Sequence, residues 1–276
     1  MTQQRLVEVN GLEIAYRQSS GEEGQVVLVH GNSASSRTWQ QLLDGPFGKR
    51  FRCLALDLPG HGASARAATA DAYSLPFYAG ALAGFARAVG ATGALLVGWS
   101  LGGHIALEAA PLLPDAAGLA VFGTPPMSTP AAMGEAFLPH PAMSVGFSEQ
   151  VGPDEARAYA ASQLAPGSAL PLDAAAQDIL ATAPAARAGL AASLAAGAFA
   201  DELAIARAMP QPLAILHGSE EQLVNLAYLR SLELPRLWRG AVQLIDGSGH
   251  APQEERPAEF AALLTEFAAE LPALRR

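Results

Sequence analysis

The chain has 276 residues, of which 50% are hydrophobic and only 16% are charged. Disordered chains have the opposite balance, so this composition predicts one large folded domain, or a core domain that carries an insertion. The formal net charge is −9 and the arginines are scattered, which leaves no concentrated basic face for nucleic acid, and no nucleic-acid partner is expected.

The sequence carries no signal for export or membrane insertion. The first ten residues lack the apolar stretch of a signal peptide, and no segment approaches the roughly 20 apolar residues of a membrane helix. The only cysteine, Cys53, lies in an apolar run and cannot form an intramolecular disulfide. We therefore expect a cytoplasmic protein with no membrane partner, in which Cys53 is a buried, inert thiol.

Short β-type runs alternate along the chain with longer helical patterns. Residues 6–9 and 12–16 flank Asn10-Gly11 and predict a β-hairpin, because Asn-Gly suits a two-residue turn. Later runs are continuously apolar, as expected for central strands covered on both faces, at residues 26–30, 51–57, 94–99, 118–122, 213–217 and 241–245. Helices are predicted at residues 36–44, 75–90, 101–113, 222–232 and 257–271. This alternation predicts an α/β fold with a mostly parallel sheet flanked by helices.

The segment between about residues 124 and 209 breaks this alternation. It contains no convincing strand, and proline-rich sequences mark both of its edges. A strandless stretch of about 80 residues is too long for an ordinary crossover. We interpret residues 125–209 as a helical cap over the carboxyl-terminal edge of the sheet, where open α/β sheets bind ligands. Residues 1–124 and 210–276 then form the core; alternatively, the helices of the segment merely pack on one face of the sheet.

The central motif of the chain is Gly98-Trp99-Ser100-Leu101-Gly102. A predicted strand leads into it, and a helical pattern follows at once. In this setting the serine lies on a sharp, strained turn, and the glycines allow the strand and the helix to approach each other. The strain exposes the hydroxyl, so Ser100 is the candidate nucleophile.

With this motif the chain resembles the α/β-hydrolase superfamily, in its serine-dependent, esterase- and lipase-like branch. The loop at residues 30–36 is similar to the oxyanion loop of the family, and residues 57–64 are similar to the turn after the next strand. Residues 247–250 resemble the loop that holds the catalytic histidine. The resemblance implies an α/β-hydrolase fold with a helical cap, and an oxyanion hole formed by the backbone N–H groups of Leu101 and Asn32.

A serine nucleophile needs a base, because a free hydroxyl is a poor nucleophile near neutral pH. Histidine suits this role, and six histidines compete for it. His250 alone combines the chain order serine, acid, histidine with a loop at the carboxyl edge of the sheet. His104, four residues after Ser100 on a predicted helix, is interpreted as a hydrogen-bonded helix histidine.

The acid of the triad is expected after the strand at residues 213–217. The family most often has an aspartate three residues after a glycine in this loop. The matching residue here is Glu221, and Glu220 is the neighbouring alternative. A glutamate can also orient the imidazole and stabilise the imidazolium. The resemblance implies a triad of Ser100, His250 and Glu221 that requires no metal and no organic cofactor.

The predicted function is hydrolysis of a small to medium, mainly apolar carboxylic ester through an acyl-enzyme intermediate. The candidate pocket residues are Phe137, Met143 and Phe147 of the predicted cap, together with Trp99, which alternatively fills space beside the nucleophile. Residues 98–103 also resemble the corresponding turn of pimeloyl-acyl-carrier-protein methyl ester esterases. A small-molecule ester is thus the expected partner, and no oligomeric state follows from the sequence. Thioesters, C–C bonds and a ligand-binding receptor with the same fold stay open as alternatives.

Overall fold

An eight-stranded sheet runs through the computed structural model, which describes residues 2–275. The strand order is β1-β2-β4-β3-β5-β6-β7-β8. The pairs β1–β2 and β2–β4 are antiparallel, and the other neighbours pair in parallel. The strands are β1 (Gln3–Val9), β2 (Leu12–Gln18), β3 (Glu23–Val29), β4 (Phe51–Leu56), β5 (Leu95–Trp99), β6 (Gly118–Phe122), β7 (Leu213–Gly218) and β8 (Gln243–Ile245).

The structure confirms the predicted hairpin and the mostly parallel sheet. Asn10 and Gly11 both have positive φ, at 52° and 79°, as a tight turn between β1 and β2 requires. Each of these runs contains a strand, and the central strands send successive side chains into opposite cores, whereas Leu244 of the edge strand β8 is exposed. Val27 and Val29 of β3 belong to one cluster of buried residues, and Val26 and Leu28 belong to another. A strand with two buried faces cannot alternate in polarity, which explains the sequence pattern.

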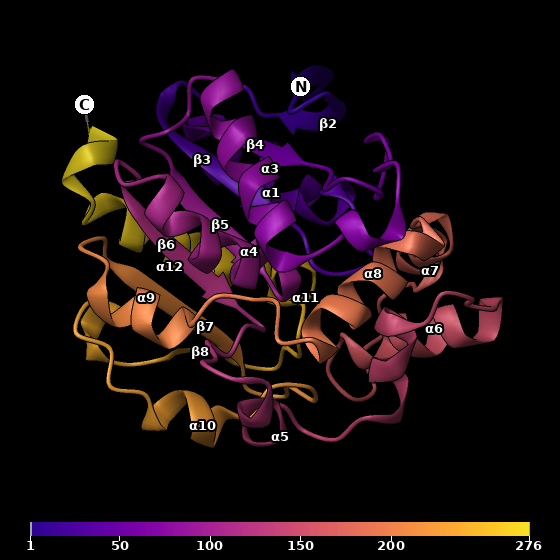
Figure 1. Cartoon of the computed structure of the whole chain (residues 1–276). Helices are drawn as coiled ribbons and strands as arrows, with labels where there is room; N and C mark the ends of the chain where they lie inside the picture. The colour runs from indigo at the N-terminus through magenta and orange to yellow at the C-terminus, as the bar shows by residue number, and fades with distance from the viewer. Residues whose placement is uncertain (1, 276) are drawn as a thin grey trace.

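Helices cover both faces of this sheet (Figure 1). The helices α3 (Leu75–Ala88) and α4 (Leu101–Ala109) supply buried side chains to one core. The helices α1 (Gln40–Asp44), α2 (Pro46–Arg50) and α12 (Pro257–Ala269) supply them to the other. The short helices η1 (Ser36–Trp39), η2 (Ala70–Ala72), η3 (Ala110–Leu112), η6 (Trp238–Gly240), α11 (Pro252–Glu255) and η7 (Pro272–Arg275) complete this part.

The helix predicted at residues 101–113 is divided into α4 and η3, and two other predicted helices differ more strongly from the structure. The helix expected at residues 36–44 is divided into η1 and α1 at Trp39, which is fully buried. The helix expected at residues 222–232 begins only with α10 (Leu226–Ser231), because Asn225 accepts a hydrogen bond at its N-terminus. The residues before Asn225 form a loop instead, and this loop contains both candidate acids.

The predicted strandless segment is helical in the structure. It comprises η4 (Pro130–Ala132), α5 (Met133–Ala136), η5 (Pro141–Phe147), α6 (Pro153–Ser162), α7 (Asp173–Ala181), α8 (Pro184–Ala195) and α9 (Glu202–Ala208). Figure 1 shows α6, α7 and α8 together beside the sheet, with α9 apart from them. The η5, α6 and α7 segments share a small apolar cluster of their own. Helix α9, by contrast, packs against α4 of the core.

Two other sequence-based expectations concern the thiol and the membrane. Cys53 in β4 is fully buried, and burial raises the pKa of its thiol to about 12. A thiol with this pKa stays protonated at neutral pH and is a poor nucleophile. Within residues 2–275, no helix is both long enough and apolar enough to cross a membrane.

Candidate active site

Ser100 lies in the turn between β5 and α4, at the carboxyl edge of the sheet. Its backbone has φ 53° and ψ −119°, a strained conformation for a residue with a side chain. Its N–H donates to the carbonyl of Phe122 in the neighbouring strand, at 2.8 Å. A Cβ at Gly98 would collide with the backbone of Gly102, and one at Gly102 would collide with the carbonyl of Val29. The two glycines are therefore required by the close approach of strand and helix.

His250 lies in the loop after β8 and is held from several sides. Its Nδ1 is 2.8 Å from Oε2 of Glu221, and its carbonyl accepts a 2.8 Å hydrogen bond from Nε1 of Trp99. The Cα of Gly123, which has φ 60°, faces the imidazole so closely that a Cβ there would lie 2.5 Å from Cε1. These contacts fix both the backbone position and the ring orientation of His250.

Glu221 occupies the loop after β7, and its side chain is only 1% exposed. Its second oxygen, Oε1, accepts a 2.8 Å hydrogen bond from the N–H of Leu223. Burial by itself raises the pKa of the carboxyl, but the charge of His250 and the hydrogen bonds from His250 and Leu223 outweigh it, so the pKa of Glu221 is lowered. Glu221 is thus an ionised acceptor facing the imidazole.

Glu220, the alternative acid, lies elsewhere. It is exposed, and it lines a surface hollow together with Gly247, Glu255 and Arg256. Its backbone N–H donates to the carbonyl of Ser248. The structure therefore brings Glu221, and not Glu220, to His250.

The two candidate oxyanion donors lie beside Ser100. Leu101 is the first residue of α4, where a helical N–H has no partner within the helix. Asn32 follows Gly31, which packs so closely that a Cβ there would lie 3.3 Å from Cβ of Ser100. The side-chain amide of Asn32 donates to the carbonyl of Gly146 in η5 at 2.6 Å. This bond ties the loop to the helical segment above it.

Two of the remaining histidines are buried in the core. Nε2 of His30 accepts from the N–H of Leu58 at 3.0 Å, and burial lowers the pKa of His30 to about 4. Burial likewise lowers the pKa of His61 to about 3. The two rings lie 5.2 Å apart between their centroids. Both are neutral hydrogen-bonding groups of the core near neutral pH.

A cavity of about 90 Å³ is lined by both Ser100 and His250. The cap candidates Phe137, Met143 and Phe147 all line it. The sequence did not single out several further lining residues, because residues far apart in the chain meet there. These are Leu75, Met127, Leu190 and Leu194, together with Leu223.

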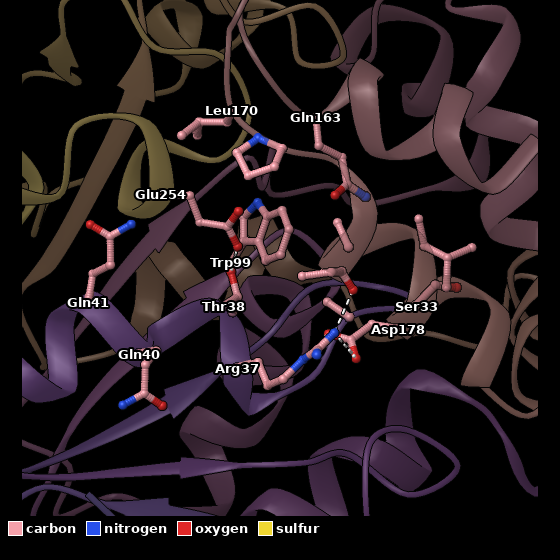
Figure 2. A pocket seen from close by; sticks show the side chains of 15 residues that line it. Ser33, Arg37, Thr38, Gln40, Gln41, Trp99, Gln163, Leu170, Asp178 and Glu254 are labelled. Carbon is pink, nitrogen blue, oxygen red and sulfur yellow. Dashed lines mark hydrogen bonds and ion pairs between the residues drawn. The ribbon is translucent and has the colours of Figure 1, made fainter. Parts of the chain in front are cut away.

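Trp99 does not line this cavity, which corrects its assignment as a pocket residue. Its side chain is turned to the other side of the nucleophile turn, where its Nε1 holds the backbone of His250. It lines a separate, larger hollow of about 320 Å³. Figure 2 shows this hollow, with Trp99, Arg37, Asp178 and Glu254 among the residues around it. There Arg37 forms a 2.9 Å ion pair with Asp178. Neither Ser100 nor His250 lines this hollow.

His104 forms a second histidine–glutamate pair that sequence reasoning missed. It lines the same cavity as Ser100, and its Nδ1 lies 2.8 Å and 2.9 Å from the two carboxylate oxygens of Glu202. Glu202 is 98 residues further along the chain, at the start of α9. The local signal is only that of a helix start, since Asp201 precedes it as the capping residue. Nothing in the pattern relates it to His104.

The described residues contain no ready metal site. Within residues 2–275, no group of three or more histidine, cysteine, aspartate or glutamate side chains could hold a metal ion.

The sequence matches the model of the alpha/beta hydrolase family over residues 26–263. The chain belongs to this family. A pimeloyl-acyl-carrier-protein methyl ester esterase from Methylococcus capsulatus is 33% identical, over 91% of this chain and 97% of the relative. Membership confirms the predicted α/β-hydrolase fold and its esterase-like branch.

Solved structures agree with this assignment. The N-acyl homoserine lactonase AidH, in a variant complexed with N-hexanoyl homoserine, is 32% identical and superposes with a TM-score of 0.94, over 99% of this chain and 98% of AidH. An esterase from Rhodococcus sp. ECU1013 is 26% identical with a TM-score of 0.78, over 98% of this chain and 99% of the esterase. The chain is therefore an esterase-like hydrolase.

Proposed function

We propose that this hydrolase cleaves small to medium, mainly apolar carboxylic esters, lactones among them, through an acyl-enzyme intermediate on Ser100. The observation that carries the proposal is the shared cavity. The strained Ser100 and His250 both line it, and a buried, ionised Glu221 accepts from Nδ1 of the imidazole of His250. Serine hydrolases use this combination of nucleophile, base and orienting carboxylate on several unrelated folds.

In the proposed mechanism Ser100 attacks the ester carbonyl while His250 takes the hydroxyl proton. Because Nδ1 of His250 faces Glu221, the proton goes to Nε2. The N–H groups of Leu101 and Asn32 stabilise the oxyanion, and each such donor contributes roughly 10²–10³ in rate in comparable sites. His250 then protonates the leaving alcohol and afterwards activates the water that releases the acid.

The cavity supports a limit on the size and polarity of the substrate. Its volume of about 90 Å³ is well below the roughly 300–1,000 Å³ of sites for drug-sized ligands. Most of its lining side chains are aliphatic, aromatic or methionine. We infer that short acyl groups bind best, and that residues 125–209 act mainly as the cap that closes over them.

The comparisons support the choice of ester bonds. The Methylococcus relative is named a methyl ester esterase, and AidH is named a lactonase, which opens a cyclic ester. Two AidH structures are variants in which a glutamate or a serine is replaced by glycine, with a ligand bound. These are the residue types that we assign to acid and nucleophile here. Thioester or C–C cleavage uses the same triad but has no comparable support.

The decisive experiment compares wild type with Ser100→Ala on p-nitrophenyl esters from acetate to decanoate. We expect the short esters to be the best substrates, and the variant to lose kcat by about 10⁴-fold to 10⁶-fold. Ser231→Ala, which changes an exposed serine on α10, is the matched control and should keep full activity. Equally slow hydrolysis by wild type and Ser100→Ala would instead favour a ligand-binding receptor.

A further inference from the structure

The histidine of the second histidine–glutamate pair lines the same cavity as the nucleophile. His104 follows Ser100 by four residues, on the first turn of α4, which corresponds to about 6 Å along a helix axis. Both line the cavity. The triad proposed above leaves His104 without a role.

The hydrogen bonds of His104 define which ring nitrogen is available. Nδ1 faces the carboxylate of Glu202, which is fully buried and also accepts from the N–H of Met127 at 3.0 Å. A carboxylate only accepts, so the hydrogen of a neutral imidazole lies on Nδ1, and Nε2 is a hydrogen-bond acceptor. Nε2 has no hydrogen-bond partner among the described residues. The ring packs beside Phe137, with the centroids 6.3 Å apart.

This arrangement is costly in an otherwise apolar region. Glu202 is fully buried, and a second carboxyl, Glu108, is buried nearby and accepts from the N–H of Ala200 at 2.8 Å. Burial and the charge of Glu202 raise the pKa of Glu108 to about 7. Buried charged groups cost free energy unless their partners compensate for it. Apolar side chains at both positions 104 and 202 would avoid this cost, which points to a ligand as the reason for the imidazole.

We propose that Nε2 of His104 accepts a hydrogen bond from an N–H or O–H group on the carbon next to the scissile carbonyl. The site then prefers esters and lactones with an α-acylamino or α-hydroxy group, and His104 determines this specificity. The inference rests on the proposed function, since it places the substrate carbonyl at Ser100.

The spacing of the two side chains suits such a substrate. The attacked carbonyl carbon lies about 3 Å from the nucleophile oxygen, and a hydrogen bond spans about 3 Å. A nitrogen on the adjacent carbon is two covalent bonds from the carbonyl carbon. It can therefore bridge between a carbonyl held at Ser100 and an acceptor one helical turn further along α4.

The test uses two lactones that differ in one group. N-butanoyl homoserine lactone has the N–H, and α-butanoyloxy-γ-butyrolactone has an oxygen in its place. Ring-opened products are quantified by liquid chromatography and mass spectrometry, and the ratio of the two kcat/KM values is the readout. In wild type we expect the N–H substrate to be favoured by about 10-fold to 100-fold, as for one hydrogen bond inside a site.

Two substitutions at position 104 test the assignment. His104→Leu should bring the ratio to about one, while His104→Gln should keep part of the preference, because its amide oxygen can accept near the position of Nε2. Met143→Leu is the matched control: it changes an apolar lining residue at similar volume, and should alter both rates together. A wild-type ratio near one, or an unchanged ratio in His104→Leu, overturns the inference while the proposed function stands. Failure of wild type to open either lactone or any p-nitrophenyl ester overturns the proposed function itself.

The tautomer of His104 gives a readout that needs no substrate. A long-range ¹H–¹⁵N spectrum of the imidazoles at pH 8 distinguishes a nitrogen that carries hydrogen from one that does not, and His104→Leu identifies the signals. We expect hydrogen on Nδ1 and a free Nε2. Hydrogen on Nε2, alone or together with Nδ1, would leave no acceptor and would overturn the proposal.

Discussion

Two histidines line the cavity, and each is paired with a buried glutamate behind it in nearly the same way. In each pair Nδ1 lies 2.8 Å from a buried glutamate, His250 with Glu221 and His104 with Glu202. Each carboxylate also accepts from a backbone N–H, at 2.8 Å for Glu221 and 3.0 Å for Glu202. The hydrogen bonds alone therefore do not tell a base from a binding residue.

The difference between the pairs lies in the elements that carry them. His250 and Glu221 stand on loops that follow two adjacent parallel strands, β8 and β7, at the same edge of the sheet as Ser100. His104 lies on α4, the helix that follows Ser100, and is tied through Glu202 to α9. A base on an opposing loop can face the serine hydroxyl across the cavity. A histidine one turn further along the same helix faces the substrate beyond it.

The largest expected effect is a difference in activity between variants of the two histidines. With p-nitrophenyl butyrate, His250→Ala should lower kcat/KM by about 10⁴-fold or more, because the serine loses its base. His104→Ala should lower it by less than about 10-fold, since this ester offers no donor for His104. Steady-state kinetics on both variants, with circular dichroism to verify folding, gives the comparison. Similar losses in the two variants would mean that both histidines act on the serine.

The next effect concerns the two acids of the loop after β7, Glu221 and Glu220. Glu221→Gln should lower kcat by about 10²-fold to 10⁴-fold, because an amide no longer enforces the tautomer or stabilises the imidazolium. Glu220→Gln, the adjacent exposed residue, should stay within about 2-fold and serves as the control. The same ester assay measures both. If the two outcomes were exchanged, Glu220 would be the triad acid.

The smallest effect concerns the carboxyl that neighbours the His104 pair. Burial raises the pKa of Glu108 from 4.5 to about 7. Between these pH values the folded state retains a proton that the unfolded chain has lost, so this group lowers the free energy of unfolding as the pH rises from about 4.5 to 7. Glu108→Gln should therefore stabilise the protein at pH 8 by about 1–2 kcal/mol, with little gain at pH 4.5.

Urea denaturation at the two pH values measures this difference. Glu149→Gln, at an exposed position, is the matched control and should show no such pH dependence. A gain of equal size at both pH values would show that Glu108 is not held in its protonated form by the fold.

The sequence by itself determined the sheet and the position of the nucleophile. Continuous apolar runs predict strands with two buried faces. The glycines around Ser100 indicate a sharp strand–turn–helix, because side chains at these positions would collide with nearby backbone. It also pointed to His250 and Glu221 through their order along the chain. The strands and the nucleophile turn depend on residues that are close together in the chain. His250 and Glu221 follow parallel strands, whose carboxyl ends lie at one edge of the sheet, so their order along the chain is enough to predict them.

The tertiary structure alone decided which side chains share the cavity. Trp99, next to Ser100 in sequence, is turned away from the cavity, because successive residues at a sharp turn face different sides. Glu202, at the start of a short helix, is brought to His104 only because α9 packs against α4. A hydrophobic pattern shows which face of an element is buried, but it does not show which residue of a distant element packs against that face.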